Sequence, residues 1–271
     1  MNAKTIGMCL LGLFVAVSAG PAHAATETVG GITYTYDIYS GAAYLGNSGS
    51  SPAIDRNTAG TIVTPTTLGG VPVTSIGPGA FWYCSNLTSI VVSEGVRYIG
   101  DYAFSFCAGI TNLTIASTVT SDPAGIFRGL DSLRTLTLPR SCLTWAQSSG
   151  YPGVDYTLPA AVAAQITSVT LCGNQWTEIP KQTFARFYSL KSITIPAEVT
   201  NIESYAFAYC TNLETVTFAE PSSLRTIGEA AFTGCSKLRA ISLPDSVTNI
   251  ETAAFANNVS LGSVRLGTGL A

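Results

Sequence analysis

The chain of 271 residues carries little charge, because Asp, Glu, Lys and Arg make up 11% of it against about 25% in an average soluble domain. Its net charge of −3 provides no basic footprint, which argues against a nucleic-acid partner. Apolar residues make up 46% of the chain, which is ample for a sizeable core.

The first 24 residues are typical of a secretory signal peptide. Lys4 supplies a positive charge, residues 6–17 are apolar, and residues 22–24 (AHA) form a small-x-small cleavage site. A retained membrane anchor is the alternative, but the apolar run is shorter than the roughly 20 residues that a span needs. We therefore expect a mature chain that begins at Ala25, has no transmembrane span, and is secreted or held at the cell surface.

Residues 25–75 differ in composition from the remainder. Residues 31–39 (GITYTYDIY) alternate as a strand does, and residues 42–45 follow a Ser-Gly turn as a hairpin partner. Residues 61–65 and 71–76 predict two further short strands. Since the first unit of a stacked array exposes its outer side, we interpret residues 25–75 as an N-terminal β cap.

From residue 76 onward, one pattern returns about every 23 residues. The sequence AFWYCSNLTSIVV at residues 80–92 recurs at residues 206–218 as AFAYCTNLETVTF. In each copy a phenylalanine is followed six, nine and eleven residues later by apolar residues. So many aligned copies identify a repeat protein. The phenylalanines are Phe81, Phe104, Phe127, Phe184, Phe207, Phe232 and Phe255.

Each repeat predicts one strand and one return. Two apolar residues of L-x-x-I-x-I lie two apart, as in a strand with one buried face, and proline often follows where pairing must end. A V-x-x-I segment then runs back, and an A-F-x-x-C turn closes the coil. Because no coil can bury its own apolar face, the coils must stack. We predict a mostly β solenoid of the α/β type over residues 76–271, with rungs of about 23 residues, one parallel sheet face, and short turns or one-turn helices as returns.

The interval between Phe127 and Phe184 breaks the period. Residues 166–171 (ITSVTL) still predict a strand, and aligning Val169 with the apolar positions puts Ala160 in the phenylalanine position. About ten extra residues then lie within residues 140–159. An insertion in a repeat array often lies on a binding face, although it can equally be tolerated at an edge.

The spacing A-F-x-x-C-x-x-L-x-x-I-x-I-P-x-x-V-x-x-I-G over residues 73–266 resembles the BspA-like, or Treponema-type, leucine-rich repeat of bacterial surface proteins. The resemblance implies a leucine-rich-repeat array in a secreted or surface-exposed protein. It also implies a binding role, since some family members are adhesins that bind host extracellular proteins or other bacteria. The pattern fails at Asp122, at Leu130 in place of Cys, and near Ala160, so we expect the array to bend or loosen there.

The cysteines fall into two groups. Cys84, Cys107, Cys210 and Cys235 each follow a repeat phenylalanine by three residues, which favours small buried core residues over a metal or redox site. Cys142 and Cys172 lie off this column. Export would permit a disulfide between them, which would contribute about 3–4 kcal/mol if the geometry allowed it.

Catalytic residues are not predicted. The only histidine, His23, lies in the predicted signal, so the mature chain lacks the base of a Ser/His/Asp or Cys/His site and has no imidazole ligand for zinc. Acidic residues recur just before the A-F turn, where we expect them to cap the turn. Neither a cofactor nor a metal ion is expected. The acids are Asp101, Glu203, Glu229 and Glu251.

Three surfaces are candidates for ligand contact. Strand positions that alternate with the apolar residues should face solvent and are mostly Ser or Thr. They would dock a protein or a glycan through hydroxyls, although Thr also simply suits exposed strands. The insertion adds two aromatic residues, and the turn aromatics either form a third surface or pack between turns. The candidate ligand-binding residues are Thr135, Thr137, Ser168, Thr170, Ser192, Thr194, Trp145 and Tyr151; the turn aromatics are Trp82, Tyr83, Tyr102, Phe106, Tyr205 and Tyr209.

No polar cap follows Leu266, so we expect the last rung to expose its edge. The sequence as a whole predicts a secreted or cell-surface protein that binds a protein or a glycan, with adhesion to host or other cells as the implied role. The alternative is a structural module that self-associates through the C-terminal edge and has no dedicated ligand.

Overall fold

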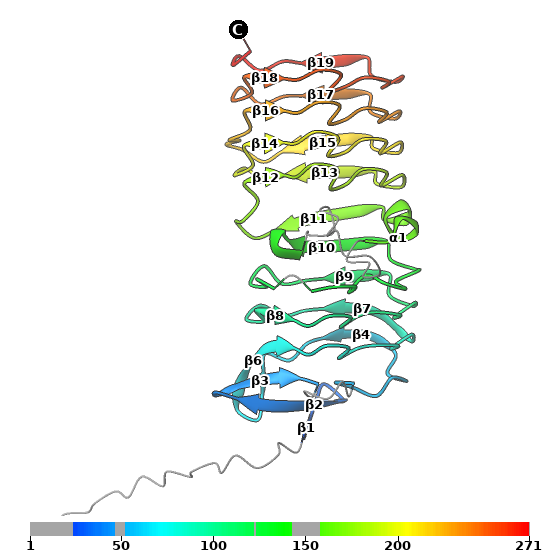
Figure 1. Cartoon of the computed structure of the whole chain (residues 1–271), viewed down its shortest axis with the longest axis vertical. Coiled ribbons are helices and arrows are strands. Elements are labelled where there is room, and N and C mark those ends of the chain that lie inside the picture. The colour runs from blue at the N-terminus through cyan, green and yellow to red at the C-terminus, as the bar shows by residue number, and fades with distance from the viewer. Residues whose placement is uncertain (1–23, 47–51, 122, 143–157, 271) are drawn as a thin grey trace, which may run out of the picture.

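A computed structural model describes residues 24–46, 52–121, 123–142 and 158–270. The chain forms an elongated stack of flat coils, with β1 near one end and β19 near the other (Figure 1). Residues 1–23 of the predicted signal peptide and the candidates Trp145 and Tyr151 lie outside the described residues.

The N-terminal strands form a small mixed sheet. β1 (Ala25–Val29), β2 (Ile32–Tyr39) and β3 (Ala42–Leu45) pair antiparallel in succession, which confirms the predicted hairpin. β6 (Val71–Ile76) then pairs parallel with β3, and the short β5 (Thr67–Leu68) pairs antiparallel with β6. The switch to parallel pairing at β6 joins this sheet to the repeats. The division of the chain at residue 75 into cap and solenoid stays a prediction.

The main sheet is parallel and takes one strand from each coil, as the repeat predicts. Its register also agrees with the predicted alignment: Asn112 pairs with Ser89 and Thr135, and Leu136 pairs with Val169. The strands are β4 (Gly60–Val63), β7 (Leu87–Val91), β9 (Asn112–Thr114), β10 (Thr135–Pro139), β11 (Ser168–Cys172), β13 (Ser192–Ile195) and β15 (Thr215–Phe218), and β17 (Ala240–Ser242) and β19 (Ser263–Arg265) pair beyond them.

The V-x-x-I segments supply a second column of very short strands on the other side of the stack (Figure 1). The first of them pairs with β6, and the later ones pair with one another in parallel. Each is limited to two residues because the chain must turn at both ends of the return. They are β8 (Tyr98–Ile99), β12 (Glu178–Ile179), β14 (Asn201–Ile202), β16 (Thr226–Ile227) and β18 (Asn249–Ile250).

The repeat phenylalanines stack within the core. Phe184, Phe207 and Phe232 are fully buried, with ring centroids 5.3 Å and 5.1 Å apart and planes within 16° of parallel. Aromatic pairs at this spacing stabilise a fold by about 0.5–1.5 kcal/mol beyond their buried area. The stack therefore ties each rung to the next.

The cysteine column is buried, as predicted, and its thiols make a specific contact between rungs. Cys210 Sγ lies 3.1 Å from the carbonyl oxygen of Phe184, and Cys235 Sγ lies 3.3 Å from that of Phe207. Burial raises the pKa of Cys210 well above its ordinary value, so its thiol stays protonated and can donate. Cysteine thus serves as a small core residue that satisfies a carbonyl of the preceding rung.

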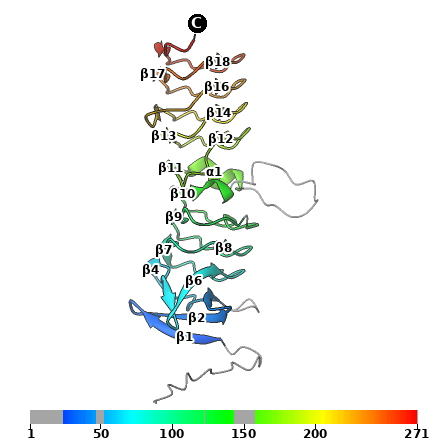
Figure 2. The same ribbon diagram turned by 90° about the vertical axis from the view of Figure 1, so that its left-hand side faces the viewer.

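The interrupted rung departs from the prediction at its turn. Ala160 does not replace a core phenylalanine, because it is exposed at the first position of α1 (Ala160–Gln165), and Val162 of that helix is buried instead. Figure 2 shows α1 at the height of β10 and β11. A six-residue helix fills the space that a tight turn fills elsewhere, so the sequence period could not place its residues.

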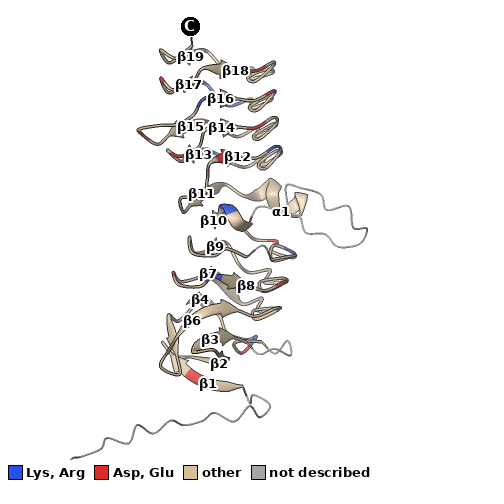
Figure 3. Ribbon diagram, turned by 60° about the vertical axis from the view of Figure 1, so that its left-hand side comes forward, with Lys and Arg blue, Asp and Glu red and all other residues tan. Residues whose placement is uncertain are grey.

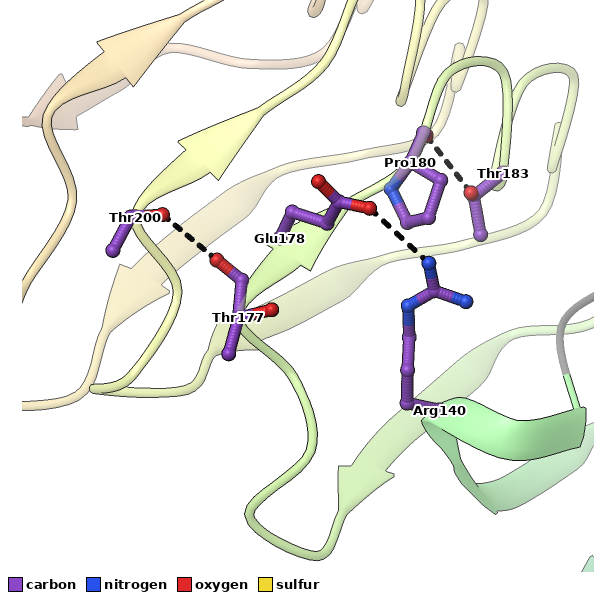
Figure 4. Close-up of polar contacts among 6 residues, drawn as sticks. All are labelled: Arg140, Thr177, Glu178, Pro180, Thr183 and Thr200. Atoms are coloured by element: carbon purple, nitrogen blue, oxygen red, sulfur yellow. Dashed lines mark hydrogen bonds and ion pairs between the residues drawn. The ribbon is translucent and has the colours of Figure 1, made fainter. Parts of the chain in front are cut away.

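After β10 the chain continues into the 3₁₀ turn η1 (Arg140–Cys142). Arg140 Nη2 lies 3.2 Å from Glu178 Oε1 of β12, which links the two sides of the interruption (Figure 4). Trp176, two residues before Glu178, is fully buried and donates its indole N–H to the carbonyl of Cys172 at 3.0 Å. No disulfide joins Cys142 to Cys172.

The recurring acids do not cap their own turns in the described chain. Asp101 Oδ1 accepts a hydrogen bond from the backbone N–H of Ala124 in the next rung, at 2.8 Å. Glu251 Oε2 accepts one from the N–H of Glu229 in the preceding rung, at 2.9 Å. These carboxylates therefore connect rungs, a role that a single-coil view of the sequence did not include.

Candidate functional site on the sheet face

The outward side of the main sheet is nearly free of charge. Strand residues that alternate with the buried apolar residues form it, and we call it the Ser/Thr face. Figure 3 shows most of the ribbon without charged residues along these strands. In its centre lie six of the predicted contact residues, of which Thr170, Ser192 and Thr194 are exposed while Thr135, Thr137 and Ser168 are half-buried.

Strand pairing along this face stops between β15 and β17, and within the seven-stranded sheet it is weakest between β11 and β13. β10 and β11 pair along five residues and β13 and β15 along four, whereas β11 meets β13 only at Ser168 and Ser192. The two strands share one end and separate beyond it. A hollow of about 380 Å³ occupies the space where the ladder would continue.

Four predicted residues line this hollow, namely Ser168 and Thr170 from β11 and Ser192 and Thr194 from β13. Thr194 Oγ1 lies 2.8 Å from Thr217 Oγ1, so that hydroxyl is already engaged. Within the described chain, the hydroxyls of the other three make no side-chain hydrogen bond, which leaves them available to a ligand. Apolar walls complete the hollow, from Val169, Leu171, Ile193, Pro196 and Ala219.

The separation has a physical cause in the interrupted rung. Just after β11, the Cys172 thiol lies 3.4 Å from the carbonyl of Ile115, two rungs back along the stack. The carbonyl of Cys172 also accepts the indole N–H of Trp176. These contacts hold the end of β11 toward β10 and away from β13. One sign of this interruption is visible in the sequence, namely the irregular interval between Phe127 and Phe184.

The chemistry of the hollow suits binding. Its lining contains no titratable side chain, only hydroxyls that donate and accept and apolar groups that can be desolvated. A hollow with a few convergent polar groups on apolar walls is the usual form of a recognition pocket. The sequence did not predict the apolar walls of the hollow. Pro196 and Ala219 directly follow β13 and β15, and their positions indicated only where those strands end.

A solenoid of parallel-strand rungs with a neutral, hydroxyl-lined face belongs to the class of binding and scaffold repeats. Residues 67–149 and 163–271 match a family model described as the BspA type leucine rich repeat region, in six copies. The chain therefore belongs to the BspA-type leucine-rich repeat family, which confirms the resemblance. The comparison with curated protein sequences gave no match.

Solved structures of other repeat proteins are similar to this chain. A leucine-rich repeat protein from Bacteroides ovatus is 26% identical, with 88% of this chain and 52% of that one covered and a TM-score of 0.45. The T. pallidum leucine rich repeat protein TpLRR is 19% identical, with coverages of 86% and 83% and a TM-score of 0.41. A leucine rich cell surface protein from Faecalibacterium prausnitzii is 18% identical, with coverages of 89% and 94% and a TM-score of 0.33. This chain spans about half the length of the Bacteroides ovatus protein.

Among residues 24–46, 52–121, 123–142 and 158–270, no helix has the length and apolar content required to traverse a bilayer. The same segments contain no cluster of three or more His, Cys, Asp or Glu side chains placed to hold a metal ion.

Proposed function

We propose that this chain is a secreted or cell-surface repeat protein that binds a partner protein through the hollow between β11 and β13. The observation that carries the proposal is the convergence of Ser168, Thr170 and Ser192, with unengaged hydroxyls, on one apolar-walled hollow. Membership in a family of surface repeats supports a role in adhesion to host or other cells. A glycan is the alternative partner for the same face.

Binding to a panel of host matrix proteins and glycans tests the proposal, and paired variants locate the site. Thr170→Glu with Thr194→Glu puts two charges at the hollow, whereas Thr135→Glu with Thr137→Glu puts two on the continuous part of the same sheet. We expect the first pair of substitutions to lower the affinity for any partner found by more than tenfold, because two carboxylates would be desolvated in the contact. The second pair should leave affinity within about threefold. Equal loss in both pairs would assign binding to the whole sheet and not to the hollow.

Catalysis is not part of the proposal. The family consists of binding and scaffold modules, and Asp101 and Glu251 make inter-rung hydrogen bonds. Turnover of a substrate that is abolished by changing one of these acids would contradict this view.

The alternative is self-association through the edge around β19. Val264 and Leu266 are 38% and 55% exposed there, which favours an apolar contact with a second copy. Measurement of the molecular mass over a hundredfold range of concentration separates self-association from partner binding. A protein that stays monomeric throughout does not self-associate.

A further inference from the structure

The turns carry a second feature that the sheet-face site does not use. Two residues before and two residues after each core phenylalanine, the backbone adopts positive φ in every described turn of the repeat. Bulky side chains rarely adopt this conformation, and glycine normally occupies it. In this chain aromatic residues fill several of these positions: Tyr83, Tyr102, Phe106, Tyr205 and Tyr209, with φ between 57° and 61°.

The first aromatic group is held rigidly by its neighbours. A Cβ at Gly125 would collide with the ring of Tyr102, and one at Gly129 would lie 2.7 Å from the Phe106 ring, so both rings rest directly on glycine backbone. Tyr83 stacks on Phe106 with centroids 4.8 Å apart and planes 9° from parallel. The positive φ belongs to the repeat, since Gln182 and Asn257 share it, and the contacts with glycine backbone and between rings position these aromatic side chains at the surface.

A hollow of about 350 Å³ opens between these turns, and we call it the turn hollow. Trp82 and Tyr102 lie on its walls and are 38% and 37% exposed, so their rings are only partly covered by protein. The remaining lining comes from Pro78, Gly79, Asp101, Phe106 and Arg128.

Two charged groups stand among the rings. The Arg128 guanidinium carbon lies 5.4 Å from the centre of the Phe106 ring, and no carboxylate of the described residues lies within salt-bridge distance of it. Asp101 uses Oδ1 to accept the Ala124 N–H, while Oδ2 has no partner in the described chain. The turn hollow thus offers flat apolar walls, an unused set of guanidinium donors and an unused carboxylate oxygen.

We propose that the turn hollow binds a neutral pyranose unit of a glycan. A pyranose has an apolar face of C–H groups that can lie against the Trp82 ring, beside Tyr102, and hydroxyls at its rim that can accept from Arg128 and donate to Asp101. The volume suits one or two sugar rings. This site is separate from the protein-binding hollow of the sheet face and does not rest on it.

Other ligands fit less well. An organic cation would use the rings and Asp101 but would be repelled by Arg128. An apolar protein side chain would leave Asp101 Oδ2 and the Arg128 guanidinium desolvated without hydrogen-bond partners, which is costly. A sugar hydroxyl satisfies both groups.

The stack contains a natural control at equivalent repeat positions in the first two coils after the interruption. A hollow of about 300 Å³ there is lined by Tyr205 and Tyr209, but Ala185 and Ala208 stand at the position of Trp82. It has tyrosine rings without an indole. The control hollow therefore lacks both the indole wall and the carboxylate that the proposal uses.

The experiment uses the chain that follows the signal peptide, with the methyl glycosides of glucose, galactose, mannose and N-acetylglucosamine as probes. We expect saturation-transfer NMR to show ring C–H contact for at least one of them. Trp82→Ala should weaken its binding at least tenfold, as should Arg128→Gln, while Tyr209→Ala in the control hollow should change it less than twofold. Because Trp82 and Arg128 are exposed, both variants should fold with an unchanged thermal midpoint.

Three results would overturn the proposal. The first is the absence of contact for all four sugars, and the second is equal loss of binding in Trp82→Ala and Tyr209→Ala. The third is displacement of the sugar by tetramethylammonium, which would make the turn hollow a cation site. Binding of the protein partner on the sheet face should be the same in Trp82→Ala, so failure of one proposal is distinguishable from failure of the other.

Discussion

At some turn positions, an aromatic ring of the preceding rung leaves space only for glycine. Gly125 lies under the Tyr102 ring with φ of +64°, so Gly125→Ala has two penalties. The left-handed backbone costs about 1–2 kcal/mol for an L-residue, and the methyl group must displace the ring. We expect the free energy of unfolding, measured in urea, to fall by more than 2 kcal/mol.

Two variants separate these penalties. Gly30→Ala has a φ of +59° and no atom within 4 Å of the added methyl, so it should show the backbone cost alone. Adding Tyr102→Ala to Gly125→Ala should recover part of the loss. No recovery would mean that the ring does not limit this position.

Glu94 makes stability depend on pH in acid. The backbone N–H and the hydroxyl of Ser117 both donate to this carboxylate at 3.0 Å, and the backbone bond is the main cause that holds the Glu94 pKa below its ordinary value. A depressed folded pKa gives a contribution that is present above the unfolded pKa and is lost as pH falls through the folded pKa. Because the group is exposed, the effect should be small.

Urea unfolding at pH values from 6 down to 2.5 checks this dependence. Glu94→Gln should flatten the acid part of the stability profile. Glu214→Gln, at an exposed carboxylate that makes no hydrogen bond within the described chain, should leave the profile as it is. Identical profiles for wild type and Glu94→Gln would show that the Ser117 contact does not contribute in solution.

At the scale of elements, the strands were predictable because their period is imposed by burial. A residue that alternates with a core residue must face outward, so the rows through Thr135 and Thr137 followed directly from counting. Two things could not be counted. Period says which residues face solvent but not how far two strands separate, so the hollow beyond Ser168 and Ser192 was hidden. The period also does not reveal that α1 replaces a turn. The helix sequence AAVAAQ contains no phenylalanine that could be aligned with those of the other repeats.

The interruption depends on Trp176 and much less on its ion pair. Trp176→Ala removes a fully buried indole and a hydrogen bond, and should lower the free energy of unfolding by about 3–5 kcal/mol. Arg140 and Glu178 are 27% and 43% exposed, so their coupling energy in a double-mutant cycle should stay below about 1 kcal/mol. Trp176→Phe keeps most of the apolar volume, so it should lower the free energy of unfolding by less than Trp176→Ala does.

A coupling above 2 kcal/mol for Arg140 with Glu178, or a loss below 1 kcal/mol for Trp176→Ala, would reverse that order. The ion pair would then be the principal link across the interruption.

At the scale of the whole molecule, each coil contacts mainly its neighbours, so damage should remain local. Phe232→Ala removes a ring stacked between Phe207 and Phe255 and should cost about 3–5 kcal/mol. Hydrogen exchange should accelerate in β15, β17 and β18 while the amides of β2, β3 and β7 stay protected. The reciprocal variant, Phe104→Ala, should show the opposite distribution. Uniform acceleration along the chain would mean that the stack unfolds as one cooperative unit.

The rings that rest on glycine make the order of the coils in the stack matter. Tyr102 needs Gly125 after it and Phe106 needs Gly129, just as Tyr209 lies against Gly234, so half of each requirement is written in one coil and half in the next. A copied coil would keep such a contact only where the coil after the ring carries glycine or a side chain that can stack on it, as Phe106 does after Tyr83. The coils of this chain are therefore not interchangeable, although they share one repeat pattern.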